Sequence, residues 1–518
     1  MPPTYSYPGV YIEEIPSVVH TITGVATSIA AFVGWAAQGP TNQATLVQSW
    51  SDFAYQFGGL DARSLLGYSV NHFFGNGGQQ AYIVRLAAAD AASGTVNVPA
   101  SGGGSAFTVT AYDSGLWSTQ YGVRIVQSPD PTRFSLLVVS TPTASQETTV
   151  ESFTNLSMLT NDPQARSVMS VVNDSRTGSQ FIQLSALSTT AGAQPVPNPL
   201  TTPGSPPSPY MLVGGLDGTV LNPNDPAFET ALNSSGTGSG GVHFLDTVPI
   251  FNLLCVPGEN TPSTIQALQT YCVGQRAFYI VDCAESDSFN SLKNGPVGIT
   301  GNDSINSAFY FPWVNAPDPL QQNRIEAFPP CGFVAGLYAQ TDATRGVWKA
   351  PAGIDASLSG VAGLTTVLTD LQNGTLNTQG IDCLRHFPVY DDVIWGARTL
   401  RGSDLVGSEW KYVPIRRTAL FLESSLYNGT QWVVFEPNDE TLWGQIRLNV
   451  GAFMRGLFLQ GAFQGTTPQQ AYFVKCDAEN NPQASINLGI VNILVGFAPL
   501  NPAEFVVIQI QQMAGQLQ

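Results

Sequence analysis

The middle of the chain contains two apolar segments on either side of a helical segment, and this order restricts the fold most. The first apolar run lies within residues 244–255 and the second within residues 277–283. Between them, residues 262–273 have a helical pattern, and Thr261 is placed to cap the N-terminus. A strand, a helix and a strand in this order require parallel strands joined by a right-handed crossover. The sequence therefore predicts an α/β domain, and residues 309–314 add a strand to its sheet.

The chain of 518 residues is too long for one hydrophobic core, so several domains are expected. Ahead of the β-α-β unit, residues 27–34 and 81–86 are predicted to be strands. Residues 51–57 are predicted to form a short helix between these strands. We assign all three elements to the same α/β domain.

After Ala87 the composition shifts to Ala, Gly and Ser, which indicates a separate domain. A proline-rich segment at residues 195–209 has the composition of a stiff, extended linker. We therefore predict a β-rich domain inserted at residues 88–205. Its predicted strands lie at residues 107–111, 123–127 and 134–139.

Near the C-terminus, an amphipathic helix is predicted to begin at Asn438 or Asp439 and to end near Leu459. Arg447 and Arg455 lie off its apolar stripe, about 80° apart around the helix axis. They are either solvated or ion-paired surface groups, or contacts to a partner. The stripe consists of Leu442, Ile446, Val450, Phe453 and Leu457.

Both ends of the chain contain a short apolar segment with the composition of a strand. At the N-terminus, Val10, Tyr11, Ile12 and Ile15 lie between prolines that exclude a helix. An unpaired strand presents backbone N–H and C=O groups, so each segment pairs either within its own subunit or with another chain. The C-terminal segment consists of Phe505, Val506, Val507, Ile508 and Ile510.

Composition and charge exclude several classes of function. The formal net charge of −17 argues against binding to nucleic acid or to an anionic membrane surface. Only 11% of the residues are charged and 43% are hydrophobic, which favours assembly. The sequence has no recognisable signal peptide and no apolar run of the roughly 20 residues that a membrane helix needs. The six scattered cysteines form no CxxC pair and are expected to be buried, reduced thiols of a protein made in the cytoplasm.

Motifs for catalysis or cofactor binding are weak. Residues 236–241 have the letters of GxGxxG, but they lie in a Ser/Gly-rich stretch before a strand, which indicates a linker. Cys383 and His386 form the one closely spaced Cys/His pair, and two ligands do not make a zinc site. We therefore predict no catalytic residue, no cofactor and no bound metal.

Four blocks of the sequence resemble contractile tail sheath proteins, the family of phage tail, R-type pyocin and extracellular injection-system sheaths. The most specific block lies within residues 389–477 and contains EWKYVPIRRTALFLESSLYNGTQWVVFEPNDETLWGQIRLNVGAFMRGLF. The supporting blocks are PGVYIEEI near the N-terminus, ESFTNLSM in the inserted domain and GLYAQTDATRGVWKAPAG at residues 336–353.

The resemblance implies a multidomain fold with both α/β and α+β parts. A sheath-type C-terminal domain with an α/β core accompanies a β-rich inserted outer domain, and extended strand arms lie at both termini. The implied parts are an N-terminal arm (1–20), an α/β middle domain (21–87 and 206–359), the inserted surface domain (88–205), the inner C-terminal domain (360–504) and a C-terminal arm (505–518).

The resemblance also implies a structural subunit and not an enzyme. Sheath subunits form hexameric rings, stacked as a helical tube around an inner tube protein, and contraction drives that tube through a target cell envelope. The implied partners are other copies of the chain, the inner tube, the baseplate and a tail terminator or cap protein, without nucleic acid and without insertion into a membrane. The particle is a phage tail or a phage-like contractile particle assembled in the bacterial cytoplasm, and some such particles are released from the cell. By this resemblance, the terminal arms donate strands to neighbouring subunits, and Arg447 and Arg455 contact the inner tube.

Two other classes of function stay open. A different self-assembling shell, such as a capsid or surface-layer-like protein, would form sheets or closed shells instead of tubes. A hydrolase with a cysteine nucleophile would have one reactive cysteine and would form small soluble oligomers.

Overall fold

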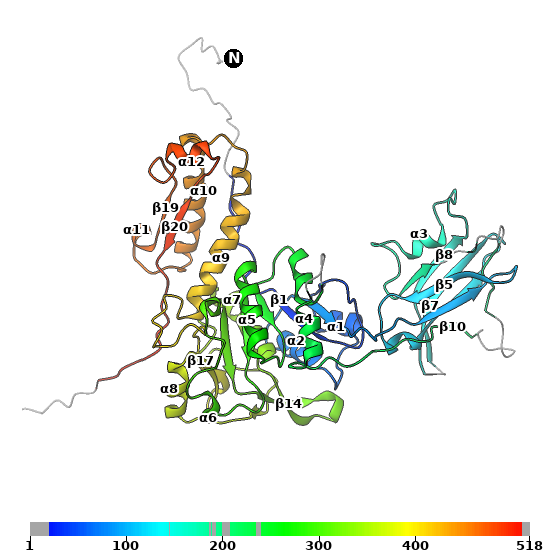
Figure 1. Cartoon of the computed structure of the whole chain (residues 1–518), viewed down its shortest axis with the longest axis horizontal. Coiled ribbons are helices and arrows are strands. Elements are labelled where there is room, and N and C mark those ends of the chain that lie inside the picture. Colours follow the sequence, from blue (N-terminus) through cyan, green and yellow to red (C-terminus); the bar gives the residue numbers. More distant parts are fainter. Residues whose placement is uncertain are drawn as a thin grey trace, which may run out of the picture. The chain divides into compact units, whose positions relative to one another are not determined.

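The computed structural model describes residues 20–143, 146–185, 188, 193–198, 208–234 and 240–509 (Figure 1). The described chain divides into two compact units. The central unit contains residues 27–345 and 350–416, and the C-terminal unit contains residues 20–26, 346–349 and 417–509. The expected boundary at residue 360 differs from this division, because residues 360–416 contribute strands to the central sheet.

An eight-stranded sheet forms the core of the central unit, in the order β18-β17-β13-β12-β11-β1-β3-β2. The edge strands β2 (Thr45–Val47) and β18 (Asp391–Ile394) are antiparallel to their neighbours. The predicted β-α-β unit is confirmed, since α5 (Pro262–Gln275) joins two parallel strands. The parallel strands are β1 (Ala30–Trp35), β3 (Ala81–Leu86), β11 (Leu253–Cys255), β12 (Phe278–Asp282), β13 (Ser307–Phe311) and β17 (Ile381–Phe387).

Helices cover both faces of this sheet, which explains why its central strands are buried along their whole length. On one face, α2 (Leu65–Gly75) and α7 (Cys331–Arg345) contribute Phe73 and Tyr338. On the other face, α5 contributes Leu268 to the core. The other helices of this unit are α1 (Trp50–Phe57), α4 (Pro226–Leu232), α6 (Phe289–Leu292) and α8 (Asp370–Thr378). A small sheet has the order β15 (Arg324–Phe328), β14 (Val314–Asp318), β16 (Gly363–Leu364). The 3₁₀ turns are η1 (Leu116–Gln120), η2 (Gly241–Thr247), η3 (Asn302–Asn306) and η4 (Pro319–Gln321).

Helices α2 and α7 approach so closely that two glycines of α7 are required at their contact. A β-carbon on Gly332 would collide with the backbone of Ser69, and one on Gly336 would lie 2.6 Å from the carbonyl oxygen of Phe73. Residues four apart lie on the same face of a helix, so both glycines face α2. The sequence block that begins at Gly336 therefore starts inside a close helix contact.

The inserted domain follows β3 and consists of two antiparallel sheets around their own core. The predicted strands at residues 107–111, 123–127 and 134–139 are all present. The first sheet contains β4 (Thr95–Pro99), β5 (Ser105–Ala111) and β9 (Ile182–Ser185). The second contains β6 (Tyr121–Gln127), β7 (Arg133–Thr143), β8 (Gln146–Ser157) and β10 (Tyr210–Met211), and α3 (Val168–Val172) belongs to the same domain.

The expected end of this domain at residue 205 differs from the structure, because β10 still pairs with β6. The described residues of the expected linker also belong to the domain. The side chain of Asn198 accepts a hydrogen bond from the backbone N–H of Ile125 at 2.8 Å. A proline-rich composition therefore does not make residues 195–198 a free linker, and residues 199–207 lie outside the described chain.

A buried arginine ties the start of the inserted domain to the central sheet. Arg85, at the end of β3, is 1% exposed, and burial lowers its pKa to about 10. One planar guanidinium with five N–H donors can hold several carbonyls in fixed positions, which a lysine cannot do. Its hydrogen bonds go to the carbonyl oxygens of Ala36, Ala37, Gly39 and Ser114.

The C-terminal unit contains two long helices and a hairpin (Figure 1). The predicted helix is confirmed as α10 (Glu440–Leu459), capped by Asp439, whose side chain accepts from the N–H of Leu442. The other elements are α9 (Val413–Gly429), which begins in the central unit, and η5 (Gln431–Val433), α11 (Pro468–Ala471), β19 (Tyr472–Lys475), α12 (Gln483–Asn487) and β20 (Leu494–Phe497).

Replacing Gly332 with alanine is expected to destabilise the protein by about 1–3 kcal/mol, because the added methyl group overlaps the backbone of α2. Gly274 in α5 is the control, since a β-carbon there meets no atom within 4 Å. Gly274→Ala should leave stability unchanged or raise it by up to about 1 kcal/mol. Urea denaturation measures both variants, and equal midpoints would contradict the packing argument.

Candidate assembly surfaces

The C-terminal tail presents four consecutive large apolar side chains to solvent. Residues 501–509 have no regular secondary structure after β20 (Figure 1). Within the described chain, no strand pairs with this tail, and Ile510 lies beyond it. Contiguous apolar side chains with such exposure indicate a surface that a partner covers. The exposed fractions are 76% for Phe505, 81% for Val506, 80% for Val507 and 79% for Ile508.

Strands β19 and β20 form a two-stranded sheet whose outer edges carry no further strand among the described residues. The long connection between them is held in place by Asn481, which is 1% exposed and bonds the N–H and the carbonyl oxygen of Asn492. On the sheet itself, Phe473 and Leu494 are each 52% exposed. A two-stranded sheet is marginal alone, and its edges invite pairing with added strands.

The first described residues, 20–26, are anchored in the C-terminal unit. The ring of His20 stacks on Trp432 with a centroid distance of 4.2 Å, and the buried side chain of Ile22 lies against Gly429 of α9. The backbone N–H of Val25 donates to Ser425 Oγ at 3.2 Å. Sequence analysis missed this anchor, because its contacts lie some 400 residues away along the chain. The predicted arm residues Val10, Tyr11, Ile12 and Ile15 lie outside the described chain.

Helix α10 buries the predicted stripe and exposes a second apolar face that sequence analysis missed. On the exposed face, Leu448 and Leu459 are 61% and 73% exposed, and Ala452 and Arg455 share the face at helical spacing. Of the predicted stripe, Phe453 is half-buried. The stripe residues Leu442, Ile446, Val450 and Leu457 are all buried.

The two arginines predicted at this helix have different surroundings. Arg447 pairs with Glu440 at 2.6 Å and also donates to the carbonyl oxygen of Cys476. Arg455 is exposed and has no ion pair within the described chain. The structure therefore ties Arg447 to its own unit and leaves Arg455 as a cation on the exposed face of α10.

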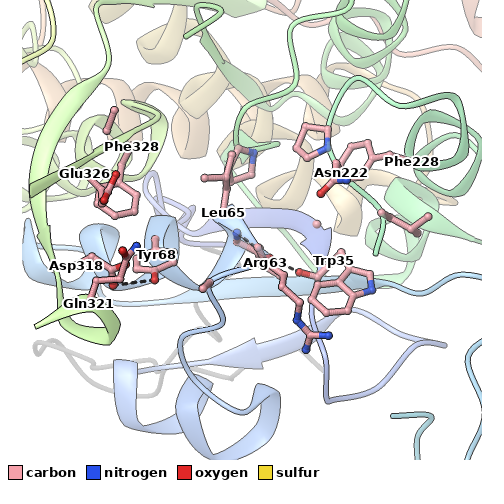
Figure 2. A pocket seen from close by; sticks show the side chains of 18 residues that line it. Trp35, Arg63, Leu65, Tyr68, Asn222, Phe228, Asp318, Gln321, Glu326 and Phe328 are labelled. Carbon is pink, nitrogen blue, oxygen red and sulfur yellow. Dashed lines mark hydrogen bonds between the residues drawn. The ribbon is translucent and has the colours of Figure 1, made fainter. Parts of the chain in front are cut away.

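A cavity of about 350 Å³ lies at the carboxyl ends of β1 and β11, where the chain order in the sheet reverses (Figure 2). Open α/β sheets often bind ligands at this position. Here the polar groups already bond to one another. Tyr68 donates to Asp318 at 2.8 Å, and the guanidinium of Arg63 pairs with Asp61 and lies 4.9 Å from the Trp35 ring. The lining contains no His, Cys or Lys that could activate a nucleophile.

The Cys/His pair found in the sequence does not form a reactive site. Both residues lie on β17, where Cys383 is 1% exposed and His386 bonds Asp392 at 3.1 Å. Across the described residues, no group of three His, Cys, Asp or Glu side chains is arranged to hold a metal ion. No described helix combines the length and apolar character needed to cross a membrane. Of the GxGxxG letters, residues 236–239 lie outside the described chain.

Two profiles of one protein family match this chain. The phage tail sheath protein central domain matches residues 245–400, and the phage tail sheath C-terminal domain matches residues 406–513, which together make up just over half of the chain. The chain belongs to the phage tail sheath protein family. It is a structural subunit of a contractile sheath, as the sequence blocks predicted.

Relatives and solved structures agree with this family. A prophage major tail sheath protein of Pseudomonas aeruginosa (strain UCBPP-PA14) is 26% identical over 285 residues, which are 53% of this chain and 69% of the relative. The helical sheath of the anti-feeding prophage in the contracted state gives a TM-score of 0.59 at 22% identity and covers 98% of this chain and 100% of that chain. The PVC sheath complex of an extracellular contractile injection system, in the contracted state, gives a TM-score of 0.58 at 21% identity. The match covers 98% of this chain and 98% of that chain. These structural likenesses establish the fold, and the predicted multidomain fold class is confirmed.

In the native sheath protein, none of the six cysteines is expected to react quickly with an aromatic disulfide reagent, because all six are buried. After unfolding in guanidinium chloride, all six should react. Absorbance of the released thiolate measures the reaction rates of the folded and the unfolded protein. One cysteine that reacts quickly in the folded protein would support the hydrolase alternative. Burial also raises the thiol pKa of Cys272, Cys283, Cys331, Cys383 and Cys476.

Proposed function

We propose that this sheath protein polymerises as hexameric rings stacked into a helical tube around an inner tube protein. The sheath grows from a baseplate, ends at a terminator or cap protein, and contracts to drive the inner tube through a target cell envelope. The work comes from subunit contacts that form on contraction, without catalysis by this chain. The observation that carries the proposal is the exposed apolar segment 505–508 in a unit that also has an incomplete two-stranded sheet.

The tail is proposed to add as a strand to the β19–β20 sheet of a neighbouring subunit. If two alternate side chains of residues 505–508 become buried, the gain is about 3–6 kcal/mol. Ordering four backbone residues costs about 4–8 kcal/mol. Side-chain burial alone therefore does not secure the strand, and main-chain hydrogen bonds to the sheet edge decide the contact. The N-terminal arm, residues 10–15, is proposed to pair in the same way.

Strand exchange of this kind joins two different surfaces of the same chain. Such heterologous contacts close into rings or continue into helical filaments, depending on the rotation between subunits. In a tube of stacked rings, contacts within one ring close on themselves, and contacts between rings continue along the tube axis. The capsid-like or surface-layer-like alternative and the hydrolase alternative have no specific observation in their favour.

The exposed face of α10 is proposed to contact the inner tube. Leu448 and Leu459 offer apolar contact area, and Arg455 offers a charge without a partner in the described chain. The sequence resemblance implies the same contact for Arg447, but the bonds of Arg447 to Glu440 and to the carbonyl oxygen of Cys476 give it a stabilising role within its own unit.

Negative-stain electron microscopy of the purified full-length protein tests the proposal as a whole. Long, hollow, striated tubes are expected. Uniform small particles at high protein concentration would contradict polymerisation by the chain itself.

Val507→Pro is expected to weaken each strand-exchange contact about tenfold, because proline removes a backbone N–H and cannot enter an interior strand position. Folding of the monomer should not change, since Val507 is 80% exposed. Val507→Thr is the matched control, because it keeps the β-branched shape and the N–H. Sedimentation velocity and tube counts in micrographs measure the effect, and normal tubes from Val507→Pro would refute the exchange.

Deleting residues 1–16 tests the N-terminal arm with the same readout.

Arg455→Glu is expected to lower retention of the inner tube in purified sheaths without changing the stability of the subunit, because this side chain has no ion pair to lose among the described residues. Arg447→Glu should instead destabilise the subunit by about 1–3 kcal/mol, because it breaks hydrogen bonds to a charged group and to a carbonyl. Tube occupancy in micrographs and thermal unfolding separate the two effects. Unchanged occupancy for Arg455→Glu would remove its assigned role.

A further inference from the structure

Residues 20–26, which we call the strap, follow helix α9 toward its C-terminal end within the C-terminal unit (Figure 1). The N–H of Val25 donates to Ser425 Oγ at 3.2 Å, one turn before the end of α9. Ile22, three residues earlier in the strap, lies against Gly429, the last residue of that helix. The strap therefore runs antiparallel to α9, and its first residue lies beyond the end of the helix.

Two glycines allow the strap to lie this close to α9. A β-carbon on Gly429 would lie 2.6 Å from Cγ2 of Ile22, and one on Gly24 would lie 2.9 Å from Cζ of Phe421. Carbon atoms in contact are separated by about 3.5–4.0 Å, so a larger residue at either position would push the strap away. Ile22 is 6% exposed and belongs to the core of the C-terminal unit. At Ile22, the strap is therefore a fixed part of this unit.

A second contact fixes the strap at its first described residue. The ring of His20 stacks on the indole of Trp432 in η5, with a centroid distance of 4.2 Å and an interplanar angle of 13°. Trp432 itself packs against the core of the C-terminal unit. Its Nε1 is buried without a hydrogen-bond partner among the described residues, so this contact uses the face of the ring. Because His20 is otherwise exposed, the stack contributes little to the stability of the subunit.

Together, the two contacts define a direction for the chain that precedes them. Residues two apart in an extended chain lie on the same side of it, and His20 and Ile22 both contact the end of α9 or the adjoining η5. A single fixed point would let the preceding chain swing freely, whereas two fixed points set the line along which it leaves. The apolar segment of the N-terminal arm, residues 10–15, ends five residues before His20.

We propose that the His20–Trp432 stack is the positioning contact of the N-terminal arm, which directs residues 10–15 toward the neighbouring subunit. This inference rests on the arm exchange proposed above and names the residues that direct it. The effective concentration of a tethered segment falls with about the −3/2 power of the tether length. Without the stack, the tether from Ile22 to Ile15 has seven residues instead of five, which alone lowers that concentration about 1.7-fold. The loss of a set direction lowers it further.

His20→Ala tests the proposal in the full-length chain. It is expected to raise the protein concentration needed for tubes by about 2- to 5-fold, with little change in the thermal midpoint of the subunit. His20→Phe is the rescue variant, because a phenyl ring also stacks on an indole, and it should restore assembly. Normal assembly of His20→Ala, or equally weak assembly of His20→Phe, would overturn the proposal.

Ser425→Ala separates positioning of the arm from stability of the subunit. This substitution removes the acceptor of the Val25 N–H and leaves the stack in place. The thermal midpoint is expected to fall, because a backbone donor loses its partner, while tubes form at the wild-type concentration. If the concentration needed for tubes follows the thermal midpoint in all three variants, the stack acts through stability alone and the positioning role is wrong.

A spin label measures the restraint of the arm directly. All six native cysteines are buried, so Ser17→Cys supplies an accessible thiol for a nitroxide label. The label is expected to move faster, with narrower lines in the electron paramagnetic resonance spectrum, in His20→Ala than in the wild-type or His20→Phe subunit. Equal spectra from all three would show that the stack does not restrain the arm, which contradicts the proposal.

These outcomes differ from those that contradict the proposed function. A wild-type chain that forms no tubes contradicts polymerisation, and normal tubes after deletion of residues 1–16 contradict arm exchange. The positioning role falls in either case. Wild-type tubes that require residues 1–16 but form equally well without the His20–Trp432 stack overturn the positioning role alone.

Discussion

Backbone hydrogen bonding of extended segments is the constraint on which the rest of this structure depends. In the central unit, parallel strands satisfy one another across the sheet, and the outer edge of β18 is covered by residues 353–358. There, Gly353 N donates to the carbonyl oxygen of Ile394, and Leu358 N donates to that of Asp392. In the C-terminal unit, the β19–β20 sheet has no such cover within the described chain, and the tail beyond it pairs with no strand. The outer edges of the β19–β20 sheet can therefore be completed by further strands.

The C-terminal unit is assembled from segments that are distant in the sequence. Residues 20–26, residues 346–349 and the chain after residue 416 meet in it, through contacts such as Val25 with Ser425. Trp348, from the GVWKAPAG block, packs against the same core as α10. Because both terminal segments begin in this unit, a mesh of exchanged arms would join C-terminal units to one another.

Local sequence patterns predicted most elements correctly. The start of α5 after Thr261, the Asp439 cap, the β-α-β order and the buried stripe of α10 depend on spacing within about thirty residues, where local rules operate. Boundaries were less predictable. The proline-rich segment was assigned to a linker, yet Asn198 bonds Ile125 inside the inserted domain, and the strand partner β10 lies beyond it. The boundary expected at residue 360 differs from the structure because β17, which follows it, pairs with β13 of the central sheet. This pairing joins segments that are distant in the sequence, so no local pattern indicates it.

By itself, the sequence determined the family, the mixed α/β architecture and the apolar character of the two ends, because these follow from local periodicity, composition and recognisable blocks. The tertiary structure alone decided which side chains lack partners. Arg447 and Arg455 look equivalent on a helical projection. In the fold, Arg447 forms an ion pair with Glu440 and donates a hydrogen bond to Cys476, whereas Arg455 has neither contact. Leu448, Leu459 and Phe435 look like core residues in the sequence, and only the fold leaves them in solvent. Exposure depends on which distant segments cover a surface, and no local pattern records that.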